Sequence, residues 1–129
     1  MTTVMTTVVL DGSSARVDGD AAEVGLALAE IFVRVRAAIA EDRPVVVRVD
    51  AEDLLGHQGP ERAAYVNAII GICRAVAFEG ASKGWRINVV AAPRDSGVTT
   101  DQLLDVVAHP SMTGQVVTLG SGLVGRVAP

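Results

Sequence analysis

The sequence predicts one α/β domain in which a mostly parallel sheet of about four strands is covered by helices on both faces. Short β-branched stretches alternate with longer stretches that carry apolar residues at three- and four-residue steps, in the order βαβαβαβ. Half of the residues are hydrophobic but only 3% are aromatic, and aliphatic side chains are those that buried parallel strands use. The 129 residues are enough for a single domain, 1–129, with its own core.

The first half of the chain predicts two strands and one helix. A strand from Thr6 to Leu10 stops at the turn signal "DGSS", so residues 1–19 form an N-terminal strand or arm, with "ARVDG" folding back as a hairpin. Asp20 caps a helix that runs to about Glu41. Pro44 then precedes the buried strand "VVVRV". The apolar face of the helix consists of Val24, Leu28, Ile31, Phe32, Val35 and Ile39.

The second half predicts a loop, two helices and two strands. The loop spans 50–60, and Pro60 opens a helix that reaches Ala81 and is apolar almost all round. A helix of that kind is usually covered on both sides, which predicts a second subunit on its outer face. "RINVVAA" is the third strand, and Thr99 or Thr100 caps the helix "DQLLDVVAH". "MTGQVVTLGSG" forms the last strand and its turn.

Composition argues against several classes of partner and ligand. The net charge is −4 and no basic run occurs, so neither a nucleic acid nor a membrane is an expected partner. No apolar run has the length of a membrane span, and the N-terminus lacks the basic region of a secretory signal, so we expect a cytoplasmic protein. His57, His109 and Cys73 lack metal-ligand spacing, so no metal is expected.

The stretch "RAAYVNAIIGICRAVAFEGASKGWRINVV" resembles the catalytic helix and following strand of the short-chain dehydrogenase/reductase family. The final "TGQVVTLGSG" is similar to the last strand of that family. The resemblance covers about residues 20–125 and implies the C-terminal half of the family fold, a truncated Rossmann-like three-layer domain. The matching positions are Gly71, Arg74, Ala75, Ala77, Glu79, Lys83, Gly84, Arg86, Asn88, Thr113, Gly114, Gln115 and Gly122.

The residues that perform the chemistry of that family are missing here. The resemblance places the catalytic Tyr at Arg62 and the catalytic Lys at Val66. The Tyr serves as general acid or base, and the Lys lowers its pKa and holds the nicotinamide ribose. Arg62 carries a permanent charge, and Val66 can perform neither task of the Lys. Tyr65 lies close by, but Ile69 stands where its Lys would be needed.

Two further parts of the family site are absent from the sequence. The catalytic Ser would lie near Val49 to Ala51, and no Ser or Thr occurs between Arg43 and Ala81. The first strand and helix are not joined by a Gly-rich dinucleotide turn, so we expect no cofactor. Hydride transfer by the mechanism of the family is therefore not expected.

Two functions remain open. In the family, the two helices retained here pack against the same pair of a second subunit. The resemblance therefore predicts a non-catalytic subunit, as a homo-oligomer or as the structural or regulatory partner of a full-length short-chain reductase. The expected interface residues are Phe32, Val35, Ala68, Ile72 and Ala75.

The alternative is a small cofactor-independent enzyme, of the isomerase, dehydratase or cyclase type. The loop "DAEDLLGHQG" follows the end of a strand, where open α/β sheets place their sites. His57 would be the general base, with Asp53 or Glu52 as its partner. An acidic loop of this kind is also commonly a solvated segment that caps a helix.

Overall fold

The structure, a computed structural model, describes residues 6–13 and 21–120. Its sheet has four parallel strands in the order β1-β2-β3-β4. The strands are β1 (Val8–Asp11), β2 (Val45–Asp50), β3 (Ile87–Ala92) and β4 (Val116–Thr118). The helices are α1 (Ala21–Ala40), α2 (Ala51–Leu54), α3 (Pro60–Glu79) and α4 (Thr100–Val106), with a 3-10 turn η1 (Ala81–Lys83) after α3.

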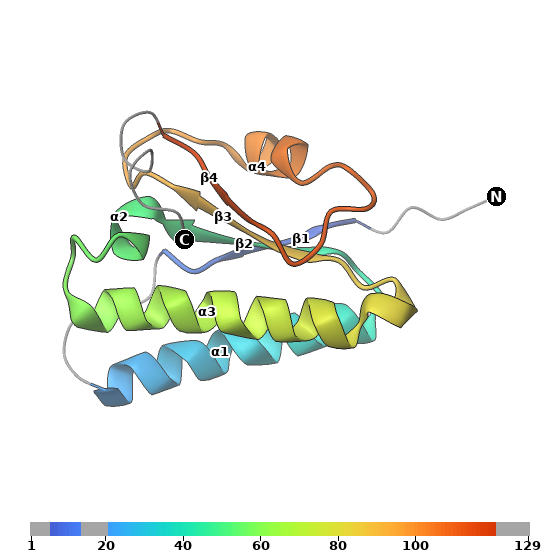
Figure 1. The fold of residues 1–129 in the computed structure, drawn as a ribbon, viewed down its shortest axis with the longest axis horizontal. Helices are drawn as coiled ribbons and strands as arrows, with labels where there is room; N and C mark the ends of the chain where they lie inside the picture. The colour runs from blue at the N-terminus through green and yellow to red at the C-terminus, as the bar shows by residue number, and fades with distance from the viewer. Residues whose placement is uncertain (1–5, 14–20, 121–129) are drawn as a thin grey trace.

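The helices form two layers, one on each face of the sheet. α1 and α3 lie side by side on one face and α4 lies on the other, while α2 lies at the end of the sheet (Figure 1). Side chains of a strand alternate between faces, so Val45, Val47 and Val49 pack under α1 and α3. Val46 points the other way and packs with Leu103 of α4. The predicted α/β fold, with mostly parallel strands between helices, is confirmed.

Several element boundaries differ from the expectation. β1 is Val8–Asp11 instead of Thr6–Leu10, and α4 ends at Val106 instead of His109. The first turn of the expected loop 50–60 is the short helix α2, which follows β2 without a break. α3 ends at Glu79 instead of Ala81, because Gly80 and the turn η1 follow it. β4 is only three residues long, much shorter than the expected strand from Met112. The hairpin "ARVDG" and the cap Asp20 lie outside the described residues, as do Ser121 and Gly122 of the expected last turn.

The segment between α4 and β4 is held by side chains of β3 and the residue before it. Arg86 donates to the carbonyl oxygens of Val107 and His109, both at 2.7 Å. The buried Asn88 donates to the Met112 carbonyl oxygen at 3.0 Å and accepts from the Gln115 amide at 3.1 Å. These bonds explain why polar residues occur in a buried strand: each one satisfies backbone groups of a segment without regular structure.

The five expected interface residues are not equally accessible. Phe32 and Ala75 are exposed, and Ala68 and Ile72 are partly exposed. Val35 is 0% exposed and belongs to the core between the sheet and the helix layer. Val35 therefore cannot be a surface contact residue, because the helical face that carries it is turned toward the sheet.

Candidate functional site

Charged side chains gather at the carboxyl ends of β2 and β3. Asp50 is the last residue of β2, and Glu52 and Asp53 belong to α2, which follows it directly. Arg62 lies in the first turn of α3, and Arg94 lies in the loop after β3. The carboxyl ends of parallel strands are where open α/β sheets place their ligands. These five residues, called the charge cluster below, are therefore the first candidate for a functional site.

Arg62 is the centre of the charge cluster. Its Nε donates to both carboxylate oxygens of Asp53, at 3.0 and 3.1 Å. One of its terminal nitrogens lies 3.8 Å from an Asp50 oxygen. Asp50 and Asp53 are each only 2% exposed, and Arg62 is buried as well. A buried charge is tolerated only when it is paired, and here the two carboxylates and the guanidinium satisfy one another.

Arg94 joins the charge cluster from the solvent side. Its Nε donates to an Asp50 oxygen at 3.1 Å, and its backbone amide donates to both carboxylate oxygens of Glu52 at 3.2 Å. The Arg94 side chain remains 46% exposed. It thus covers the buried carboxylates and ties the loop after β3 to α2.

Burial is the main influence on the Asp50 carboxyl group. Removal from water raises the pKa of Asp50 above its ordinary value, and the hydrogen bond and charge of Arg94 act against this rise. The nearby carboxylates of Asp53 and Glu52 add smaller effects that also raise it. Arg94 therefore favours the charged form of Asp50, in addition to linking the loop after β3 to α2.

The backbone before α3 brings Arg62 back over α2. Gly56 and Gly59 have φ angles of +78° and +103°, which side-chain-bearing residues rarely adopt. Pro60 then occupies the first turn of α3, where its missing N–H costs nothing. The chain thus reverses direction between α2 and α3, which places Arg62 within ion-pair distance of Asp53.

The positions to which the resemblance assigns catalytic groups fall in or beside the charge cluster. Arg62, in place of the Tyr, is held by carboxylates, and it cannot exchange a proton because a guanidinium stays protonated. Val66, in place of the Lys, is buried in the core. Asp50, within the stretch expected to carry the Ser, is held by Arg94. The charged groups at these positions therefore form ion pairs with one another.

Tyr65 is the tyrosine nearest to the position at which the resemblance places a catalytic Tyr. Its hydroxyl is buried and has no hydrogen-bond partner among the described residues, and Ile69 packs in the same cluster. Burial is the main cause that raises the pKa of Tyr65 to about 12. A phenol that is enclosed and this weakly acidic cannot serve as a general acid or base near neutral pH.

The three residues of the alternative enzyme site do not bond to one another through their side chains within the described residues. Asp53 is engaged by Arg62, and Glu52 accepts from the Arg94 amide. His57 is exposed, and within residues 6–13 and 21–120 its ring forms no ion pair with a carboxylate. The structure thus brings Glu52 and Asp53 to the cluster and leaves His57 at its edge.

Sequence reasoning did not single out Arg94 or the pairing role of Arg62. One signal was available: three carboxylates occur directly after the mostly apolar stretch "VVVRV", and buried carboxylates require cations. Which arginine supplies the cation depends on the fold, because Arg94 is 44 residues from Asp50 in sequence.

The described residues lack two further kinds of site or segment. No group of three or more His, Cys, Asp or Glu side chains there is arranged to hold a metal ion. None of the helices in that part of the chain is long and apolar enough to cross a membrane.

Comparison with known proteins supports the fold. No protein-family model matches the chain, and no curated protein sequence matches it either. Solved structures do match. A 4-hydroxyisoleucine dehydrogenase, in complex with NADH and succinate, superposes with a TM-score of 0.59 at 18% identity, over 89% of this chain and 68% of the dehydrogenase chain.

A second similar structure is the promiscuous reductase LugOII, which catalyses keto-reduction at C1 in lugdunomycin biosynthesis. It has a TM-score of 0.63 at 22% identity, over 91% of this chain and 60% of the reductase chain. At such identities the likeness concerns the fold alone. The chain therefore has a Rossmann-like α/β fold that spans roughly two thirds of the length of these dehydrogenase and reductase structures.

Proposed function

We propose that this protein is a non-catalytic subunit with the fold of short-chain dehydrogenases and reductases. It acts by association, as a homo-oligomer or as the structural or regulatory partner of a full-length reductase. Two groups of observations support the proposal: the bonding of the charge cluster, and the exposed apolar surface of the helix layer.

The charge cluster argues for a structural role of the region in which a reductase would react. Arg62 and Asp53 are buried and mutually bonded, so neither is available to a substrate. Val66 provides no charge where the family holds the nicotinamide ribose. The region contributes cohesion between α2, α3 and the loop after β3 instead of acid–base chemistry.

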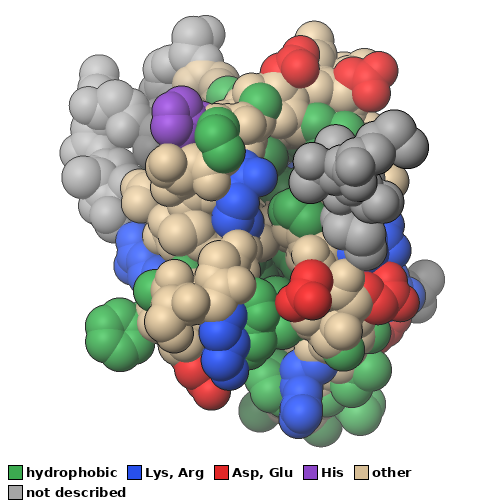
Figure 2. Space-filling view, turned by 90° about the vertical axis from the view of Figure 1, so that its right-hand side faces the viewer, with side chains coloured by type: hydrophobic (Ala, Val, Ile, Leu, Met, Phe, Trp, Pro, Cys, Tyr) green, Lys and Arg blue, Asp and Glu red, His purple; other side chains and the backbone are tan. Residues whose placement is uncertain are grey.

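The observation that carries the proposal is the outer surface of α1 and α3. Leu26, Val33 and Phe78 are large hydrophobic side chains that are more than half exposed, and all three belong to these two helices. Ala68 and Ala75 add small apolar positions on α3. Figure 2 shows hydrophobic side chains gathered at the lower edge of the molecule, where this helix layer lies. Exposed apolar side chains on both helices of one layer favour a role of this layer in association.

The test is the mass of the protein in solution, measured by light scattering over a range of concentrations. We expect a dimer, or a stable complex with a full-length reductase that is identified by mass spectrometry after purification from cells of the source. Ala68→Glu and Ile72→Glu should split the assembly, since each places a charge in an apolar contact. Circular dichroism verifies that the variants fold.

Asp101→Arg, on the opposite face of the sheet, is the matched control and should leave the mass unchanged. The association proposal fails if the wild-type protein stays monomeric at every concentration and retains no reductase. A hydride-transfer activity with NADH or NADPH would contradict the non-catalytic part.

A further inference from the structure

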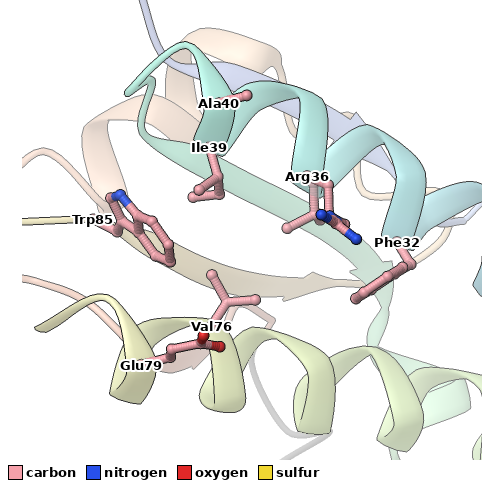
Figure 3. A pocket seen from close by; sticks show the side chains of 8 residues that line it. Phe32, Arg36, Ile39, Ala40, Val76, Glu79 and Trp85 are labelled. Atoms are coloured by element: carbon pink, nitrogen blue, oxygen red, sulfur yellow. The ribbon is translucent and has the colours of Figure 1, made fainter. Parts of the chain in front are cut away.

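A groove with a volume of about 470 Å³ runs between the C-terminal parts of α1 and α3. Phe32 and Ile39 extend from α1 toward α3, Val76 extends from α3 toward α1, and Trp85 stands at one end (Figure 3). Val35 forms the buried floor. The groove is therefore apolar and aromatic, and it opens on the surface that the proposed association uses.

Opposite charges flank this groove. Arg36 belongs to the α1 side and Glu79 to the α3 side. Within the described residues neither side chain takes part in an ion pair, although the Arg36 guanidinium lies 5.8 Å from the centroid of the Phe32 ring. An occupant that brings its own carboxylate next to an apolar side chain would complement the α1 side.

Phe78 has the features of such an occupant. It is 89% exposed, more than any other large hydrophobic side chain of the described residues, and it directly precedes Glu79. Phe78 cannot fill the groove of its own chain, because two residues along a helix correspond to a rotation of about 200°, so Phe78 and Val76 point to opposite sides of α3. Only a Phe78 from another copy can reach the groove.

We propose that the groove is occupied by Phe78 of a second copy of this chain, with Glu79 of that copy against Arg36. In a two-fold dimer every contact occurs twice, so Phe78 of each copy would enter the groove of the other. The inference rests on the proposed association and specifies its partner and contact. One segment, Phe78–Glu79, supplies both the apolar side chain and the carboxylate that the groove requires.

Charge reversal tests the contact in the full-length chain. Arg36→Glu leaves two acidic groups at each contact, and Glu79→Arg leaves two basic groups, so each variant alone should dimerise more weakly. In an equimolar mixture the two variants should form a heterodimer, because each contact then joins a Glu to an Arg. Sedimentation velocity, with one variant carrying a fluorescent label, reports the mixed species.

Phe78→Ser tests the apolar part. Two Phe side chains lose their burial in each dimer, so the dimer dissociation constant should rise by at least about 100-fold. Phe78→Leu, which keeps an apolar side chain, should have a smaller effect. Asp105→Arg in α4 is the charge-reversal control on the other face of the sheet and should leave the dissociation constant unchanged.

The outcomes separate this inference from the proposed function. A wild-type dimer that is insensitive to Phe78→Ser and to both charge reversals overturns the groove contact but leaves association standing. A wild-type chain that remains monomeric overturns the self-association on which the contact rests. If the double variant Arg36→Glu/Glu79→Arg dimerises but the mixture of single variants does not, the two charges interact within one chain, and the contact is refuted.

Discussion

Asp53 shows how one side chain depends on another for its place in the interior. Its carboxylate can be buried because two hydrogen bonds from the Arg62 guanidinium offset the free energy that its removal from water costs. A buried ion pair of this kind contributes little net stability compared with apolar side chains. Removing only one of its partners, however, strongly destabilises the fold, because the other charge stays buried without compensation.

Asp53→Ala is therefore expected to lower the free energy of unfolding by about 3–5 kcal/mol, because it leaves the Arg62 charge buried with fewer partners. The double change Asp53→Leu/Arg62→Met should recover most of the loss. Urea unfolding followed by circular dichroism measures both. If the double variant is as unstable as Asp53→Ala, packing and not charge accounts for the effect.

At the scale of elements, the junction between α3 and β3 depends on a glycine. The Trp85 ring lies directly against Gly80, where a Cβ atom would overlap it. The Lys83 ammonium lies 4.5 Å from the centroid of the Trp85 ring, so the last residue of the turn η1 also contacts the indole. This arrangement ends α3 and sets the end wall of the groove.

Gly80→Ala should destabilise the protein by about 1–3 kcal/mol, since the ring must move out of its packed position. Gly25→Ala is the matched control: Gly25 lies inside α1 with nothing near its Cβ position, so alanine there should stabilise by about 0.5–1 kcal/mol. Thermal unfolding of both variants measures these changes in stability. Equal effects of the two changes would show that Trp85 does not restrain Gly80.

At the scale of the whole molecule, two weak acids are enclosed in the same core cluster beneath α1 and α3. Burial is the main cause that raises the pKa of both Tyr65 and Cys73 to about 12, from ordinary values of 10.0 and 9.0. Both belong to α3, and the sheet encloses them from one side. Their protonation is thus linked to the integrity of the complete fold.

The contribution of these two groups to the free energy of unfolding should consequently be constant up to about pH 9 and fall as the pH rises toward about 12. The sign follows because the unfolded chain releases these protons at lower pH than the folded chain, which favours unfolding in alkali. Denaturant titrations across this range measure the slope. Tyr65→Phe should reduce the slope and, at neutral pH, stabilise by about 1 kcal/mol, because the buried hydroxyl has no hydrogen-bond partner in the described part of the chain. An unchanged slope in this variant would contradict the assignment.

The order of helices and strands, the parallel sheet and its two helical layers follow from the sequence by itself. The apolar periodicity of α1 and the β-branched runs of β2 and β3 act over a few residues, so they can be recognised locally. The prediction that this chain lacks the Tyr–Lys pair of the family is equally local, because it rests on Arg62 and Val66, four residues apart on one helix.

Only the tertiary structure decided which side chains meet. It placed Val35 in the core and Phe78 in solvent, although both are apolar helical residues, because the direction of each depends on where the sheet lies. It joined Arg94 to Asp50, and it assembled the groove from α1, α3 and Trp85. Such contacts link residues far apart in sequence, and no periodic pattern encodes them, since they arise when the chain is packed and buried charges must find partners.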